Sequence, residues 1–440
     1  MASSDHAPAP LEHGASDRSA VEPLTVEDWQ QRVLAEFERT IVEAVPLSEA
    51  RGRTVAVDVH TRHPVPLFDN SSMDGYAVLH SDVRDASPEH PVELVVVGDV
   101  PAGSDEDPRI SPGTAVRVMT GAPVPSKADA VVPVEDTAEH RDAGRWVTPE
   151  DDAPTVHVSA APVSGRFIRR AGEDAAEGSV VLAAGHVLSP AALASIAAAG
   201  FAEVQVTRRP RVVVVSTGSE LVAPGSRPAR GKIPDSNTEL LAALIEEAGG
   251  SVVGRALVSD DPARLLEVLH ALAPEDVDLV VLSGGVSAGA FDVVKEVLST
   301  EGSVTFARLA MQPGKPQGFG RLASGIRVFC LPGNPVSALV SFELFVRPAL
   351  ATMLGRRIVL ERTLNGIAGA GWSSPAGRRQ YIPVEVELDS GQGIVVRPSA
   401  TGGSASHLVV SLAAAEGLAV VSAEVTEVRP GDAVGVLLLG

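Results

Sequence analysis

Residues 211–221 read RVVVVSTGSEL, and this stretch decides the fold. Four consecutive valines run into a turn of Ser, Thr and Gly, a pattern typical of a short strand buried on both faces of a sheet. Two later segments repeat the pattern, DLVVLSGGVS at 278–287 and IRVFCLPGNPVS at 326–337. Helix-like segments separate the three strands, so we predict an α/β sandwich with a mostly parallel sheet over residues 208–355.

Helix starts within this region carry capping signals. Ser236 and Glu239 have the spacing of a capping box, and Gly249 marks the end of the helix that they begin. Asp261 and Pro262 are typical of the N-cap and first position of a second helix. We therefore predict helices that begin at residues 237 and 262.

Outside this region the sequence changes character several times. Thr25 precedes an amphipathic helical pattern, and short β-rich runs separated by Gly and Pro occur both before residue 162 and after Gly355. The first 22 residues have almost no large apolar side chains. The predicted multidomain organisation is a disordered tail (1–22), a helical and strand linking domain (23–60 with 163–207), a β-rich insert domain (61–162), the α/β domain (208–355) and a C-terminal small β-barrel (356–440).

Composition limits the classes of partner. The 440 residues include 36 Lys and Arg against 56 Asp and Glu, a net charge of −20, so nucleic acid is not expected as a partner. Cys330 is the single cysteine and permits no internal disulfide. The N-terminus lacks the order of a signal peptide, and no run of about 18 apolar residues occurs. We expect a cytoplasmic protein that does not enter a membrane.

Two loops that follow predicted strands are candidate ligand sites. SGGVS (283–287) and PGNPVS (332–337) combine glycine or proline with hydroxyl side chains and lead into helices. Loops at the carboxyl ends of parallel strands bind anions through glycine backbone and helix N–H groups. Either loop alone is more typical of an ordinary tight turn, because Gly and Pro are the usual turn residues. The presence of both in one sheet favours a phosphate site.

Acidic residues gather at the same predicted sheet edge. Glu220, Asp260 and Asp292 each follow a predicted strand or its loop. Carboxylates that converge repel one another unless a cation neutralises them, so the pattern suggests a magnesium site. Helix capping is the alternative for these acids, because Asp260 and Asp261 both precede a helix, where a carboxylate is favourable.

Two further segments carry polar groups suited to binding. MQPGKPQGFG (311–320) holds Lys315 in a frame of Gly and Pro, with Arg308 just upstream, and these cations would suit phosphate or another oxyanion. PLFDNSSMDGYAV (66–78) threads apolar residues through a polar turn, which suggests a loop anchored in a cleft.

Taken together, these motifs resemble one family. PLFDNSSMDGYAV, RVMTGAPVPSKADAVVPVE, RRAGEDA, STGSEL, LSGGVSAGAFD, MQPGKPQGFG and CLPGNPVSA occur in the order found in the molybdopterin molybdenumtransferases, the MoeA and gephyrin E-domain family. The resemblance covers about residues 24–440. It implies a magnesium-dependent enzyme of molybdenum cofactor biosynthesis that inserts molybdate into adenylylated molybdopterin and releases AMP. It also implies a homodimer with a cleft shared between protomers, and transient contacts with other proteins of the pathway.

The resemblance assigns roles to individual residues. The functional polar positions of the family fall on Asp69, Thr120, Asp174, Glu220, Asp260, Asp292 and Lys315. Magnesium would be held by Glu220, Asp260 and Asp292, and molybdate by Arg308, Lys315 and Ser404. The pterin phosphate side would be bound by Ser283, Gly284, Gly285, Ser287, Gly314, Pro332, Gly333, Asn334 and Ser337.

The sequence departs from the family pattern at three places. Gln312 and Arg308 stand where lysines are frequent, which predicts a less basic oxyanion pocket. Pro383 stands near an expected arginine, for which Arg378 and Arg379 are candidate replacements. The segment that contains Ser404 matches the family only loosely.

Two rival functions follow from the same residues. A molybdopterin adenylyltransferase would use only the α/β domain, and would not need the DNSSMDGYAV and TGAPVP segments. A gephyrin-like scaffold would be expected to have a long linker or a fused second enzyme domain, and the sequence shows neither. The transferase is therefore the predicted function.

Overall fold

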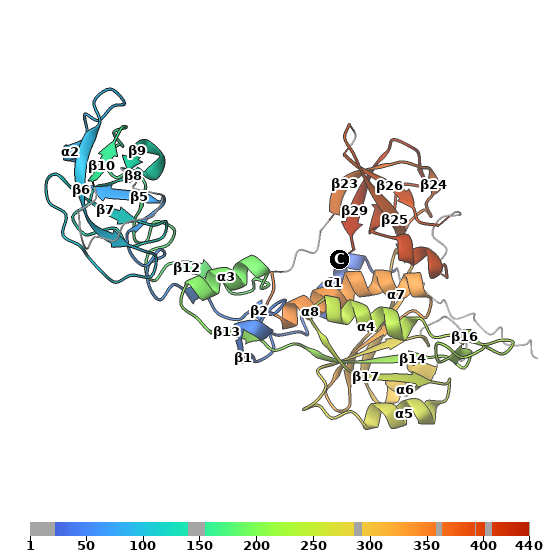
Figure 1. Ribbon diagram of the computed structural model, residues 1–440. Helices are drawn as coiled ribbons and strands as arrows, with labels where there is room; N and C mark the ends of the chain where they lie inside the picture. The colour runs from blue at the N-terminus through green and yellow to red at the C-terminus, as the bar shows by residue number, and fades with distance from the viewer. Residues whose placement is uncertain are drawn as a thin grey trace, which may run out of the picture. The chain divides into compact units, whose positions relative to one another are not determined.

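The computed structural model describes residues 23–139, 155–285, 293–357, 363–391, 393–400 and 407–439. The chain forms two compact units. Unit 1 contains the chain up to Arg39 and again from Arg209 onward, and unit 2 is the intervening segment Thr40–Arg208 (Figure 1). The predicted finer division into five parts stays a prediction.

A six-stranded sheet forms the centre of unit 1. Its strands lie in the order β17 (Ser251–Val258), β14 (Arg211–Thr217), β18 (Leu279–Ser283), β22 (Arg327–Leu331), β21 (Pro316–Leu322) and β19 (Gly302–Arg308). The first four are parallel, and the last two are antiparallel to their neighbours. The predicted α/β sandwich is confirmed, with a mixed sheet.

The valines of β14 explain why this sheet is covered on both faces. Val212 and Val214 belong to one apolar cluster, whereas Val213 and Val215 belong to another. Because successive strand residues point to opposite faces, an unbroken valine run requires helices on both sides. The helices of the domain are α4 (Asn237–Glu247), α5 (Pro262–His270), α6 (Val293–Thr300), α7 (Pro335–Ser341) and α8 (Arg347–Met353).

Helices α7 and α8 form one continuous helix through a π-helical segment, Phe342–Val346. Its 19 residues are long and apolar enough to cross a membrane, but 78% of the most apolar window is buried inside the fold. Helix α1 (Val26–Leu34) contributes to the same apolar cluster, and its Gln30 Nε2 donates a hydrogen bond of 2.9 Å to the Leu344 carbonyl. Burial of this kind identifies a central packing helix.

The predicted helix starts at residues 237 and 262 are confirmed, but the capping box at Ser236 is wrong. The Thr25 and Asp261 side chains cap α1 and α5, and in the structure Ser189 caps a further helix, α3 (Pro190–Ala198). At α4 the Ser236 side chain makes no capping hydrogen bond. The preceding Asp235 carboxylate accepts the backbone N–H groups of residues 237 and 238 at 3.1 and 3.2 Å. A carboxylate one position earlier thus replaces the expected serine cap.

The C-terminal part of unit 1 is the predicted small β-barrel. The barrel closes because β25 (Arg379–Asp389) pairs with β27 (Gly417–Val421) as well as with β26 (Gly393–Pro398). Strands β23 (Thr363–Ala368) and β29 (Ala433–Leu438) complete it. A two-residue strand, β20 (Met311–Gln312), pairs with the start of β25 and so joins the barrel to the loop that carries Lys315.

Unit 2 is built mainly of β-strands. Its larger sheet has the strand order β8 (Ala130–Pro133), β5 (Gly75–Val78), β7 (Thr114–Val118), β6 (Val92–Val100), β10 (Thr155–Val158) and β9 (Thr137–Glu139). The chain enters through β1 (Val42–Pro46) and leaves through β13 (Glu203–Thr207), which pair antiparallel.

Candidate active site

A pocket of about 1100 Å³ opens in unit 1 where β14, β18 and β22 end. This is where ligands bind in sheets of parallel strands, because the following helices present free N–H groups there. Many of the predicted site residues line it. They are Glu220, Asp260, Ser283, Gly284, Gly285, Arg308, Lys315, Pro332, Gly333, Asn334 and Ser337.

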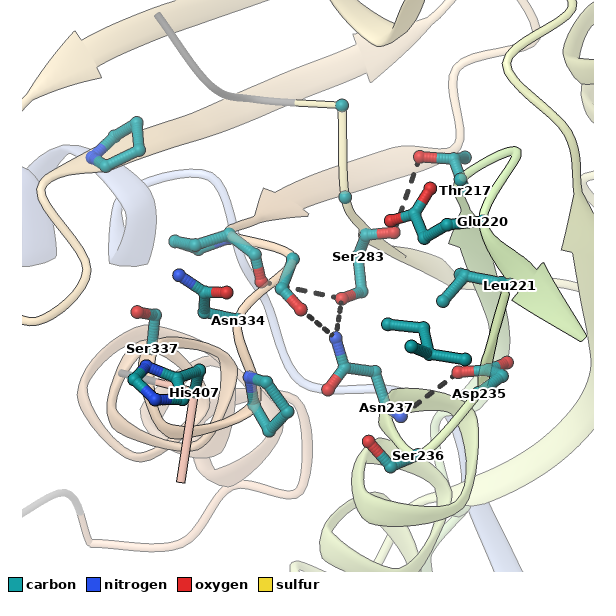
Figure 2. Close-up of a pocket in the computed structure, with 18 of the residues that line it drawn as sticks. Thr217, Glu220, Leu221, Asp235, Ser236, Asn237, Ser283, Asn334, Ser337 and His407 are labelled. Atoms are coloured by element: carbon teal, nitrogen blue, oxygen red, sulfur yellow. Dashed lines mark hydrogen bonds between the residues drawn. The ribbon is translucent and has the colours of Figure 1, made fainter. Parts of the chain in front are cut away.

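The buried side chain of Asn237 joins the two predicted binding loops. Its Nδ2 donates to the Ser283 hydroxyl at 2.7 Å and to the Gly333 carbonyl at 2.6 Å (Figure 2). The residue is only 8% exposed, and its Oδ1 has no hydrogen-bond partner among the described residues. One amide therefore ties the SGG and PGN turns together and leaves an acceptor in the wall of the pocket.

Glycine is required where these loops approach their neighbours. Gly284 has a φ of +98°, and a Cβ there would lie 2.3 Å from the Thr217 carbonyl oxygen. A Cβ on Gly333 would lie 3.3 Å from the Gly284 Cα, so the two loops are in backbone contact. The glycines serve this close approach as well as the turn itself.

Two of the three predicted magnesium ligands, Glu220 and Asp260, line the pocket. The Asp260 carboxylate accepts the backbone N–H of Ser219 at 2.8 Å, and the Ser219 hydroxyl accepts the Asp260 N–H at 3.1 Å. The N-cap of helix α5 is Asp261, whose carboxylate accepts the Ala263 N–H, and not Asp260. Within the described ranges no group of three or more metal-binding side chains occurs, and Asp292 lies outside those ranges.

Arg308 and Lys315 bring positive charge to the same pocket. They lie at the joined ends of β19 and β21, where Arg308 is in register with Pro316. Gln312, which departs from the family pattern, accepts a hydrogen bond of 3.2 Å from the Arg378 guanidinium. Pro383 is buried within the barrel strand β25. Arg378 therefore supplies a cation beside the position where the family pattern has lysine.

Asp69, Thr120 and Asp174 lie in unit 2. There the loops of their three motifs join: β4 (Asn70–Ser71) pairs with β11 (Ile168–Arg169), and the Val124 N–H donates to the Asp69 carbonyl.

Two of these three side chains hold neighbouring loops. The Asp69 carboxylate accepts from the Ala171 N–H at 2.8 Å and from the Arg170 guanidinium at 2.6 Å, and these groups lower its pKa, the N–H most strongly. Thr120 donates through its N–H and its hydroxyl to Asp74. Asp174 is exposed, and its carboxylate makes no hydrogen bond or ion pair with another described residue, so it is available to a ligand.

Comparison with known proteins identifies the chain. Family models match residues 24–200 (MoeA N-terminal region, domain I and II), 213–352 (probable molybdopterin binding domain) and 365–439 (MoeA C-terminal region, domain IV). The chain is 43% identical over 408 residues to molybdopterin molybdenumtransferase 2 of Mycobacterium tuberculosis, which covers 91% of this chain and 96% of that protein. The chain belongs to the MoeA family. The resemblance inferred from its motifs is confirmed.

Other MoeA relatives agree over most of the chain. The molybdopterin molybdenumtransferase of Haemophilus influenzae is 38% identical over 336 residues, 76% of this chain and 78% of that protein. The crystal structure of the molybdopterin biosynthesis MoeA protein from Pyrococcus horikoshii OT3 has a TM-score of 0.78 at 28% identity, and covers 95% of this chain and all of that one.

Several residues that line this MoeA pocket were not among the predicted site residues, and three predicted site residues lie outside the described part of the chain. Asn237, Lys295, Gln317 and His407 all line the pocket, and His407 is drawn on the same side as Ser337 and Asn334 in Figure 2. The DSN triplet at the start of α4 was the available signal for Asn237. Gly314 adjoins the pocket residue Lys315. The predicted residues Ser287, Asp292 and Ser404 lie outside the described residues.

Replacing Asn237 by leucine should destabilise unit 1. The change leaves the Ser283 hydroxyl and the Gly333 carbonyl without their donor, which costs about 1–3 kcal/mol. Ser236→Ala is the matched control, because that side chain makes no capping hydrogen bond, and it should change stability by less than about 0.5 kcal/mol. Calorimetric unfolding measures both. Equal losses in the two variants would contradict the assigned roles.

Asp69→Asn should lower the melting temperature of unit 2 at pH 7. Because the pKa of Asp69 is lowered in the folded protein, its contribution is present above the unfolded pKa of about 3.9 and is lost as pH falls through the folded value. The difference from wild type should therefore persist at pH 5 and shrink in melts carried out below about pH 4. Asp174→Asn is the control, and it should melt like wild type throughout. A difference for Asp69→Asn that stays constant with pH would exclude this ionic role.

Proposed function

We propose that this MoeA protein is a molybdopterin molybdenumtransferase that inserts molybdenum from molybdate into adenylylated molybdopterin and releases AMP, in molybdenum cofactor biosynthesis. The observation that carries the proposal is the pocket formed by the SGG and PGN turns, which the Asn237 amide joins. It offers glycine backbone and hydroxyl groups, three carboxylates (Glu220, Asp235 and Asp260) and three cations (Lys295, Arg308 and Lys315) within one cavity of about 1100 Å³. This is the set of groups that a substrate with a phosphoanhydride and an incoming oxyanion requires.

The proposal assigns a role to each group of residues that lines the pocket. The SGG and PGN turns hold the phosphate side of the pterin substrate through backbone N–H groups and the Ser283 and Ser337 hydroxyls. Lys315 and Arg308 attract molybdate, because ammonium and guanidinium groups are suited to oxyanions. Catalysis then comes mainly from holding the two anionic substrates together in a site that offsets their repulsion.

Magnesium fits the residues present. Mg²⁺ in phosphate-processing sites is usually bound by one or two carboxylates together with substrate phosphate and water. Glu220 and Asp260 line the pocket and would hold the ion, with Asp292 as a third candidate. The ion would supply positive charge to the phosphate oxygens when the adenylate is cleaved. Asp260 also fixes the Ser219 turn, so its role would be partly structural.

The two rival functions receive less support. A molybdopterin adenylyltransferase would not require the MoeA N-terminal and C-terminal regions that flank the central domain. A scaffold would not require a pocket lined by both carboxylates and cations.

The proposal is tested by turnover of adenylylated molybdopterin with molybdate, measured as AMP release and cofactor formation in a magnesium titration. Glu220→Gln should reduce turnover at least about tenfold and raise the magnesium concentration needed, because a ligand is lost.

The matched control is Asp261→Asn, next to Asp260. It should lose less than about 1 kcal/mol of stability, because asparagine accepts the same cap hydrogen bond and only the charge near the helix N-terminus is removed, and it should keep its turnover per folded molecule. Wild-type protein that forms no cofactor under these conditions would refute the transferase. Glu220→Gln with normal turnover would remove the metal role from that residue.

We also propose a homodimer whose cleft draws Asp174 from one protomer and Glu220 from the other. In sedimentation the wild type should have the mass of a dimer, as expected for a two-fold assembly. Inactive Asp174→Ala and Glu220→Ala proteins, refolded together, should regain about a quarter of wild-type activity per mixture, because half of the dimers are mixed and each has one intact site. Each variant refolded alone is the control. A fully active monomer, or no recovery in a mixture shown to contain mixed dimers, would overturn the shared cleft.

A further inference from the structure

We propose that Gln317 is a positioning residue for Lys315. In this inference, which rests on the proposed function, a buried relay from Gln317 through Ser341 to Ser337 fixes the loop that presents Lys315 to the oxyanion. The relay ties that loop to helix α7, which begins at the PGNPVS turn.

The relay is a chain of three hydrogen bonds with a consistent direction. Gln317 Nε2 donates to the Gly314 carbonyl at 2.7 Å and to the Ser341 hydroxyl oxygen at 2.6 Å. The Ser341 hydroxyl in turn donates to the Ser337 carbonyl at 2.7 Å. Both amide protons of Gln317 are therefore used, and the serine proton is directed into the helix.

All members of the relay are buried. Gln317 is 1% exposed, Ser341 is fully buried and Ser337 is 4% exposed. A buried amide is retained at low cost only when its donors are satisfied, and hydrogen bonds of this kind are strong away from water. The relay therefore holds its partners more firmly than a surface contact of the same geometry would.

The main chain is fixed on both sides of the Lys315 side chain. The Gly314 carbonyl accepts from Gln317, and the Lys315 carbonyl accepts the Leu309 N–H at 2.8 Å. Gly314 has a φ of +94°, and a Cβ there would lie 3.2 Å from Ser341 Oγ and 3.4 Å from Gln317 Nε2. The loop therefore packs directly against the Gln317–Ser341 pair, and this pair fixes the distance between the loop and α7.

This anchoring matters because lysine is flexible. Its ammonium lies at the end of a four-carbon stem with considerable rotamer freedom, so a fixed Cα limits where the charge can be in the pocket. Ser337 belongs to the relay and also lines the pocket. The relay therefore links the position of the Lys315 charge to the loop proposed to hold the substrate phosphate, and small displacements between such groups reduce rates strongly.

The test compares Gln317→Met with Gln30→Met in the full chain. Methionine keeps the length of the side chain and removes its donors. Gln30 is the matched control, since it is also buried, donates one amide hydrogen bond to a main-chain carbonyl of the same long helix, and does not line the pocket. The readouts are hydrogen exchange of residues 311–317 by mass spectrometry, the Kd for molybdate by calorimetry, and the KM for molybdate.

Gln317→Met should speed exchange in residues 311–317 and raise the Kd and KM for molybdate about tenfold. Gln30→Met should change none of these. In a Lys315→Ala background, Gln317→Met should still speed exchange but no longer alter molybdate binding, because its effect passes through that lysine. If Gln317→Met does not fold, Ser341→Ala, which removes one link only, should show a smaller change in the same direction.

Unchanged exchange and unchanged Kd in a folded Gln317→Met protein would overturn the proposal, as would a loss of molybdate affinity that persists undiminished in the Lys315→Ala background. Exchange and molybdate binding do not depend on turnover. A failure of the transferase function, seen as no cofactor formation by wild type, is therefore distinguishable from a failure of the positioning role.

Discussion

Asn237 donates two hydrogen bonds in the interior of unit 1, one to each of two loops that leave neighbouring parallel strands. Parallel strands end at the same sheet edge, but nothing in the strands alone fixes how their loops meet. The amide provides that constraint, and the contact between Gly284 and Gly333 permits it. The hydroxyls, glycine backbone and carboxylates of the pocket lie around this contact between the two loops. A side chain without a proposed chemical role thus determines where the chemical groups lie.

The charged part of the pocket depends on a second constraint, the attachment of the Lys315 loop. Strand β20 adds the start of this loop to the barrel, and Gln312 accepts a hydrogen bond from Arg378. His407 and Val409, from the chain segment between barrel strands, also line the pocket. In a chain with a net charge of −20, local cations must be held in place to create an attractive site for an anion. The barrel therefore contributes to the site as well as to the fold.

Much of the fold followed from local sequence, because the decisive signals are local. The valine run of β14 predicts burial on both faces, and Thr25 and Asp261 cap the helices that their positions indicate. The capping box predicted at Ser236 is wrong because the spacing of Ser236 and Glu239 does not take into account the neighbouring Asp235 carboxylate, which accepts the same N–H groups. The antiparallel strands β19 and β21 depend on pairing across the sheet, which the sequence does not specify.

The site was predictable only in part for a related reason. Glycine, proline and charged residues in motifs identify the loops, and Glu220, Asp260 and Lys315 do line one pocket. The residues that hold these loops, Asn237 and Gln317, are ordinary amides in sequence. Their importance arises from burial and from partners that are 96 and 24 residues distant in the chain.

Unit 2 leaves and rejoins the rest of the chain at one place. The Thr40 hydroxyl donates to the Arg208 carbonyl, the Arg208 N–H donates to the Ile41 carbonyl, and β1 and β13 continue as a pair. A segment of 169 residues between Thr40 and Arg208 thus begins and ends within hydrogen-bonding distance. In evolutionary terms, such a module can be gained, lost or exchanged as a single insertion. Unit 1 needs only a short linker to connect the two chain ends that the module leaves behind.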